Sequence, residues 1–177
     1  EKDFKSAHLV ELPIGEYDFS LVRHFLFDHS EYIRFDMLSK SSFEPLANLA
    51  KKYKGEIKYH VFHANTWIRQ LMKGTEESKA RIQQSFNEAY PLAFGIFEPG
   101  PFEDVLKREG IFEGEAALEK RWIETVSGIV EDCGIILPEV SDKTVGYGGR
   151  SGYHTEYLNP LLLEMSEVLR LEPGAEW

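Results

Sequence analysis

The chain has 177 residues, of which 42% are hydrophobic and 13% aromatic, as in a globular rather than a disordered protein. Its formal net charge of −10 argues against nucleic acid as a partner, because phosphate backbones are bound by clustered Lys and Arg. No apolar run approaches the roughly 18 residues that cross a bilayer, and no signal peptide follows Glu1. The length suits one domain over residues 1–177. Because the single Cys133 cannot form an internal disulfide, we expect the protein in the reducing cytoplasm.

The first part of the chain predicts two long helices after an extended entry. Residues 1–17 contain Pro and Gly breakers and are expected to be extended. A helix is expected over residues 18–38, with Asp18 or Ser20 as its cap. A second helix is expected over residues 43–72, with a proline in its first turn. Because the connection between them is short, the two helices should be antiparallel neighbours.

The middle of the chain continues in the same helical pattern. A third helix is expected to begin near Thr75 and to be kinked by Pro91. A break at residues 98–101 precedes a short helix at 102–109, and another helix is expected over 115–132. Acidic residues along these helices are interpreted as solvated surface, and they include Glu76, Glu77, Glu113, Glu115 and Glu119. Strand signals are weak throughout, which predicts an all-α fold.

The C-terminal part is rich in glycine and then apolar. Residues 134–153 are expected to form an irregular, Gly-rich connection. The last helix is expected over residues 155–171, with Thr155 as its N-cap and His154 in a structural contact beside it. A terminal indole is costly to leave in water, so Trp177 is expected to dock back onto the protein.

The second helix carries polar residues on an apolar stripe. Spacings of three and four place seven residues on one face: Leu46, Leu49, Tyr53, Glu56, His60, His63 and Trp67. We interpret Glu56 and His60 first as a buried hydrogen-bond or ion-pair network, a remnant of a metal site, because buried charges need partners. The alternatives are that they bind a metal, as carboxylates and Glu-x-x-His pairs do in ferritin-like di-iron proteins, or that they are partly exposed. The spacing here is one residue longer, with Tyr59 where His would stand.

Two further residues are candidates for polar chemistry. Asp28 lies on the apolar face of the first helix, where it is either a core-facing acceptor or a metal ligand together with Glu56 and His60. The loop around Arg150 lacks the spacing of a phosphate-binding fingerprint. Arg150 is therefore interpreted as fixing the loop or an interface, with contact to an anionic group of a ligand as the alternative.

Four stretches of the chain carry a resemblance to a known family. They are DFKSAHLVELPIGEYDF, GEIKYHVFH, LMKGTEESKARIQ and the ending GGRSGYHTEYLNPLLLEMSEVLRLEPGAEW. With these motifs, the chain resembles the structural subunit of ring-1,2-phenylacetyl-CoA epoxidases, in the phenylacetic acid catabolic protein family. The resemblance covers almost all 177 residues, but only the later two-thirds or so of a typical member, whose first long helices have no counterpart here.

This resemblance implies a fold, partners and a role. It implies a ferritin-like helical bundle, which another chain completes if the first helices are absent. The implied partners are a homologous di-iron catalytic subunit and a small bridging subunit, in phenylacetate degradation. The family's Tyr-His motif falls on Tyr59 and His60, and the longer Glu56–His60 spacing agrees with a non-catalytic subunit that stabilises the catalytic one. No cofactor is then expected in this chain, since the di-iron centre belongs to the partner.

Two other functions remain open at this point. One is a ferritin-like di-iron oxidoreductase that binds iron itself through Asp28, Glu56 and His60, with ligands from elsewhere. The other is a stand-alone helical homodimer of altered role, in which a second copy covers the exposed apolar faces of the first two helices.

Overall fold

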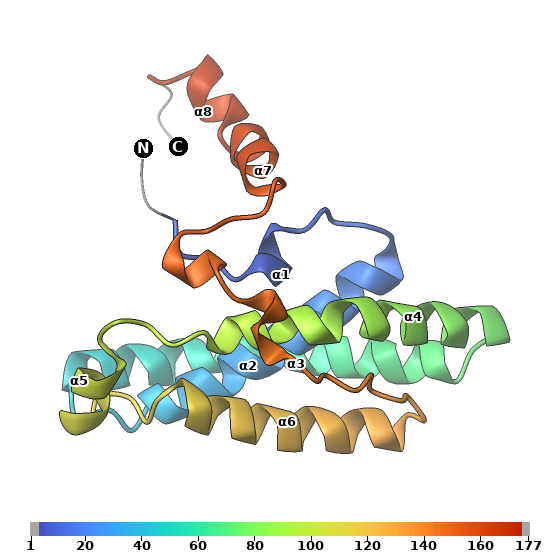
Figure 1. Ribbon diagram of the computed structural model, residues 1–177, viewed down its shortest axis with the longest axis horizontal. Helices are drawn as coiled ribbons and strands as arrows, with labels where there is room; N and C mark the ends of the chain where they lie inside the picture. The colour runs from blue at the N-terminus through green and yellow to red at the C-terminus, as the bar shows by residue number, and fades with distance from the viewer. Residues whose placement is uncertain (1–3, 175–177) are drawn as a thin grey trace.

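Figure 1 shows the computed structural model, which describes residues 4–174. Over this range every regular element is helical, so the all-α prediction is confirmed. The α-helices are α1 (His8–Glu11), α2 (Tyr17–Leu38), α3 (Glu44–Met72), α4 (Glu76–Ala93), α5 (Glu103–Arg108), α6 (Glu115–Asp132), α7 (Leu158–Met165) and α8 (Glu167–Leu171). The 3₁₀ turns are η1 (Phe94–Phe97), η2 (Lys143–Gly146) and η3 (Gly149–Ser151). Over residues 4–174, no helix is long and apolar enough to cross a membrane.

Helix α2 lies at the centre of the bundle and packs against α3, α4 and α6 (Figure 1). As the short connection predicts, α2 and α3 run antiparallel. Polar contacts fix their register: His29 Nε2 lies 2.9 Å from Asn65 Oδ1, and Lys54 forms an ion pair with Asp36. Such side-chain pairs specify one alignment of two long helices that apolar packing alone would allow to slide.

The core is centred on the indole of Trp122 on α6, which is fully buried. Its ring stacks on Tyr90 at 5.5 Å between centroids, while Phe94 and Phe97 approach it at 5.6 and 5.1 Å. The indole Nε1 donates a hydrogen bond of 2.9 Å to the carbonyl oxygen of Leu26. This one side chain therefore joins α6 to α2, α4 and η1.

Two predicted helix starts differ from the structure. Helix α2 begins one residue earlier, after Glu16, and Asp18 does not cap it; its carboxylate instead accepts hydrogen bonds from Arg81 (2.9 Å) and Ser85 (3.0 Å) on α4. The last helix begins at Leu158 rather than at Thr155. In both cases the predicted capping side chain bonds a residue far away in the sequence instead: Asp18 bonds α4, and Thr155 bonds Glu11.

The N-terminal entry also differs from the prediction. Residues 1–17 were expected to be extended, but α1 forms one helical turn within them. Leu9 of α1 is fully buried, and α1 contacts α4 and η1. Tertiary burial thus stabilises a helix too short to form alone.

The Gly-rich connection crosses the bundle at η1 because two glycines let the backbones touch. A Cβ atom on Gly95 would lie 2.0 Å from the carbonyl oxygen of Gly146, and one on Gly146 would lie 2.5 Å from that of Leu92. Gly148 and Gly152 have φ values of 119° and 92°, which other residues resist. These contacts hold Arg150 over η1.

Helices α7 and α8 extend away from the bundle (Figure 1). The helix breaks at Ser166, whose hydroxyl donates to the carbonyl oxygen of Leu162 at 2.6 Å, a contact that bends helices. Large apolar side chains are exposed along it, namely Leu163, Met165, Val168, Leu169 and Leu171. The predicted docking of Trp177 lies outside the described residues.

Candidate functional site

The seven-residue stripe of α3 faces outward, so the interpretation of Glu56 and His60 as a buried network is wrong. Both side chains are exposed. Helix α3 turns its small residues toward the bundle instead, with Ala50, Ala64 and Ile68 buried. Alanines let α2 approach closely, which leaves the larger aromatic residues on the other side.

We call this exposed side the outer face of α3. It comprises Leu49, Tyr53, Glu56, Tyr59, His60, Phe62, His63 and Trp67. Tyr59 and Phe62 are 68% and 65% exposed, values unusual for large aromatic residues in an isolated chain. Exposed aromatic residues gathered on one surface are typical of protein interfaces.

The charge of α3 differs from that of the whole chain. Its 29 residues contain five basic and two acidic side chains, whereas the chain carries a net charge of −10. Lys51, Lys52 and Lys58 are exposed beside the aromatic residues. The outer face is thus both aromatic and basic, which favours a partner surface with apolar and acidic groups.

Asp28 lies half-buried on α2, next to the outer face. Burial raises the pKa of Asp28, and the nearby imidazoles of His24, His60 and His63 oppose that rise. The structure brings Asp28 and His60 into one neighbourhood, as the sequence predicts. Glu56 is not among the groups that perturb Asp28.

A di-iron centre needs carboxylates and histidines from four helices. Within residues 4–174, no three His, Cys, Asp or Glu side chains are grouped so that they could hold a metal ion. The described residues therefore do not fit a di-iron centre built by this chain. The assignment of Asp28, Glu56 and His60 as metal ligands remains a prediction.

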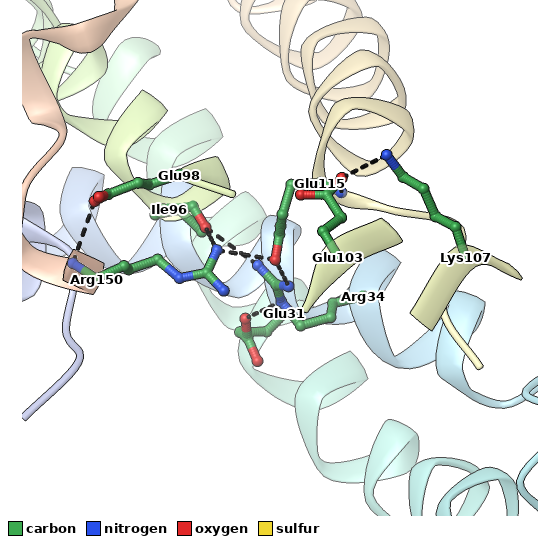
Figure 2. Close-up of polar contacts among 8 residues, drawn as sticks. All are labelled: Glu31, Arg34, Ile96, Glu98, Glu103, Lys107, Glu115 and Arg150. Carbon is green, nitrogen blue, oxygen red and sulfur yellow. Dashed lines mark hydrogen bonds and ion pairs between the residues drawn. The ribbon is translucent and has the colours of Figure 1, made fainter. Parts of the chain in front are cut away.

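A second polar cluster lies under the Gly-rich connection (Figure 2). Glu115 Oε1 accepts from Arg34 Nη1 at 2.8 Å and pairs with Arg150 Nη1 at 2.9 Å. Both arginines also donate to the carbonyl oxygen of Ile96, and Arg34 Nε donates to Glu31 at 3.1 Å. Interpreting Glu115 as solvated surface was wrong, since it is only 5% exposed.

Two groups of this region have shifted pKa values. Burial alone would lower the pKa of Arg34, but the carboxylates of Glu115 and Glu31 outweigh it and raise that pKa. On the other side of the loop, Glu98 accepts hydrogen bonds from the backbone N–H groups of Gly148 (2.8 Å) and Arg150 (3.2 Å). Burial would raise the pKa of Glu98, but these bonds and that from Ser151 lower it. The loop-fixing interpretation of Arg150 agrees with these contacts.

A third cluster fastens the base of α7 to the N-terminal segment. Glu11 is 1% exposed. Its Oε1 accepts from Ser6 (2.8 Å) and lies 2.7 Å from His154 Nδ1, while its Oε2 accepts from the backbone N–H (2.8 Å) and hydroxyl (2.9 Å) of Thr155. His154 makes a structural contact, as expected. The hydroxyl of Thr155, which was expected to cap the helix, donates to Glu11 instead.

This cluster predicts a pH-dependent contribution to stability. Burial alone would raise the pKa of Glu11, but the hydrogen bonds from Thr155, His154 and Ser6 outweigh it and lower the pKa below its ordinary value of 4.5. A lowered carboxyl pKa stabilises the fold above pH 4.5, and this stability is lost as the pH falls further. We expect Glu11→Gln to lower the free energy of unfolding by about 1.5–3 kcal/mol at pH 7.

The measurement is urea unfolding at a series of pH values. The difference between wild type and Glu11→Gln should shrink as the pH falls below 4.5. Glu139→Gln, at an exposed position, is the matched control and should change little. A difference that stays constant down to about pH 3 would contradict this account.

Comparisons with known proteins agree with the resemblance. The family model for the phenylacetic acid catabolic protein matches residues 1–177. The chain is also 28% identical over its full 177 residues to one of the subunits of the 1,2-phenylacetyl-CoA epoxidase of Escherichia coli (strain K12), and it covers 71% of that protein. A match over the whole chain shows the family. The chain therefore belongs to the phenylacetic acid catabolic protein family.

Proposed function

We propose that this chain is a structural, non-catalytic subunit of a phenylacetyl-CoA ring epoxidase that acts in phenylacetate degradation in the cytoplasm. Its role is to stabilise a homologous di-iron catalytic subunit by helix packing, in a complex with a small bridging subunit. The observation that carries the proposal is the exposed, aromatic and basic outer face of α3. The similarity to a protein named as one subunit of such an epoxidase supports it.

The size and composition of the outer face suit a stable interface. A helix of 29 residues is about 43 Å long, enough to span one side of a partner subunit. Tyr and Trp are frequent at the energetic centres of interfaces, where large rings are desolvated together. Tyr53, Tyr59 and Trp67 supply such rings along the helix.

The polar residues of the chain support a non-catalytic role. The strongly buried carboxylates of Glu11, Glu98 and Glu115 are all engaged by donors that hold loops and helix ends in place. Asp28 and His60, the residues closest to a metal-ligand pattern, lie beside the outer face. Iron chemistry in the complex is accordingly assigned to the partner subunit.

We expect Phe62→Asp to weaken binding to the catalytic subunit about 30-fold, because it places a charge beside Tyr59 in a desolvated part of the interface. The measurement is biolayer interferometry with the catalytic subunit immobilised, after co-expression has shown that a complex forms. Since Phe62 is 65% exposed in the free chain, the variant should unfold at the wild-type temperature.

The matched control is Phe102→Asp, the same substitution at a phenylalanine that is 70% exposed before α5. It should bind like wild type. Equal binding by wild type and Phe62→Asp would exclude the outer face of α3 as the interface. Failure of the wild-type chain to bind at all under mild salt would contradict the proposed function itself.

The second candidate is that this chain binds metal itself. The imidazoles of His24, His60 and His63 act on the pKa of the half-buried Asp28, but within residues 4–174 these side chains are not grouped as in a metal site. Stoichiometric iron in the purified chain, lost in Asp28→Asn and His60→Ala, would support that candidate. A homodimer of the free chain that Phe62→Asp dissociates would instead support the stand-alone alternative.

A further inference from the structure

A pocket opens beside the Gly-rich connection, between the N-terminal segment, α2 and η1. Its polar lining includes Lys5, Ser6, Glu31, Arg34 and Arg150. Its basic side chains are Lys5, Arg34 and Arg150. Glu31 pairs with Arg34, and Glu115 pairs with both arginines. In a chain with a net charge of −10, three cations gathered beside one pocket stand out, although Glu31, Glu115 and Glu98 lie close to them.

Half of the Arg150 guanidinium is free to bind something else. Its Nη1 is used by Ile96 and Glu115, whereas no hydrogen bond or ion pair of Nε or Nη2 is found within residues 4–174. The side chain is 27% exposed and lines the pocket. Lys5 is exposed and also has no hydrogen-bond or ion-pair partner among the described residues.

The position of Arg150 is fixed before any ligand arrives. Glu98 accepts the Arg150 backbone N–H, while Glu115 and Ile96 hold Nη1. The Nε–Nη2 edge of a guanidinium matches the two oxygens of a carboxylate or phosphate, and a nearby ammonium adds a second charge. A donor fork that is already held in place loses little entropy on binding.

We propose that this pocket is an oxyanion site, in which Arg150 and Lys5 bind the phosphate or carboxylate group of a small molecule. Arg150 supplies the fork and Lys5 the second cation. Arg34 is less exposed and pairs with Glu31. The site uses no residue of α3 and does not depend on the proposed function.

The test is isothermal titration calorimetry of the free chain with inorganic phosphate and with acetate, at constant ionic strength. We expect one saturable site for at least one of the two anions. Lys5→Gln and Arg150→Gln should each weaken it about tenfold, the effect of losing one charge-assisted hydrogen bond. Lys120→Gln, which removes the same charge at an exposed position on α6, should bind like wild type.

The affinities for the two anions distinguish the two kinds of ligand. A site for phosphate groups should bind phosphate more tightly, and a site for carboxylates should bind acetate more tightly. Arg150→Gln also removes contacts to Ile96 and Glu115, so Lys5→Gln, which removes no hydrogen bond or ion pair within residues 4–174, decides the matter. Absence of saturable binding to wild type overturns the proposal. Equal affinities for Lys5→Gln and Lys120→Gln overturn it as well, and neither result bears on association with a catalytic subunit.

Discussion

Glu115→Gln is expected to lower the free energy of unfolding by about 3–5 kcal/mol, the range observed when a buried ion pair loses one partner. The Glu115 carboxylate compensates two guanidiniums, those of Arg34 and Arg150, which are only 17% and 27% exposed. The amide keeps the shape of the side chain but not its charge. Two partly desolvated cations would then face each other without their shared counter-charge.

Urea unfolding followed by circular dichroism measures this loss. Glu113→Gln is the matched control, because Glu113 pairs with Arg121 on the exposed surface two residues before Glu115. Exposed ion pairs contribute little, so we expect a change below about 1 kcal/mol for this control. Equal losses for the two variants would mean that the Arg34–Glu115–Arg150 cluster does not stabilise the loop over η1.

Trp122→Ala is the second substitution with a large expected effect, a loss of about 3–5 kcal/mol. The indole is fully buried and contacts rings from α4 and η1, and its N–H bonds the backbone of α2. Removing it opens a cavity at the meeting point of these elements. Trp122→Phe keeps a ring but loses the hydrogen bond, so its loss should be smaller, about 1–2 kcal/mol.

Trp67→Ala provides the comparison, since Trp67 lies on the outer face of α3 and is 43% exposed. In the free chain this substitution should change the free energy of unfolding by less than about 1 kcal/mol. Thermal unfolding of the free chain ranks the three variants. A Trp122→Ala protein as stable as Trp67→Ala would contradict the described core.

The sequence predicted the helices well because their ends carry local signals. Helix α6 spans the expected residues 115–132, and α3 starts within one residue of its prediction. The start of α4 is fixed by Thr75, whose hydroxyl accepts from the backbone N–H of Ser78. Breakers and caps act over a few residues, so they can be recognised without knowledge of the fold.

Which face of α3 is buried could not be predicted in the same way. Both faces of the helix carry apolar residues at helical spacing, and the stripe with Tyr53 and Trp67 is the more hydrophobic in appearance. The structure buries the alanine face, because small residues allow close packing against α2. An alanine series in the sequence was the signal that could have distinguished the two faces.

The polar clusters depend on residues far apart in the sequence. Arg150 was recognised as a loop-fixing residue, but Glu98 and Glu115 were not recognised as its partners. Glu11 and His154 are separated by 143 positions. No local pattern encodes such pairs, because Glu and Arg are mostly found on solvated surfaces and their presence alone does not indicate a buried partner. The glycines of the loop were predicted for their backbone freedom, which applies to Gly148 and Gly152, whereas Gly146 is required by close contact.

Native mass spectrometry of this chain co-expressed with the proposed catalytic and bridging subunits tests the central claim most directly. The spectrum reports which chains associate and, after a subunit is ejected in the gas phase, which chain carries the iron. The account predicts a heteromeric complex from which this chain is ejected without metal. A chain that remains apart from the catalytic subunit, or that is ejected with two iron ions bound, would contradict it.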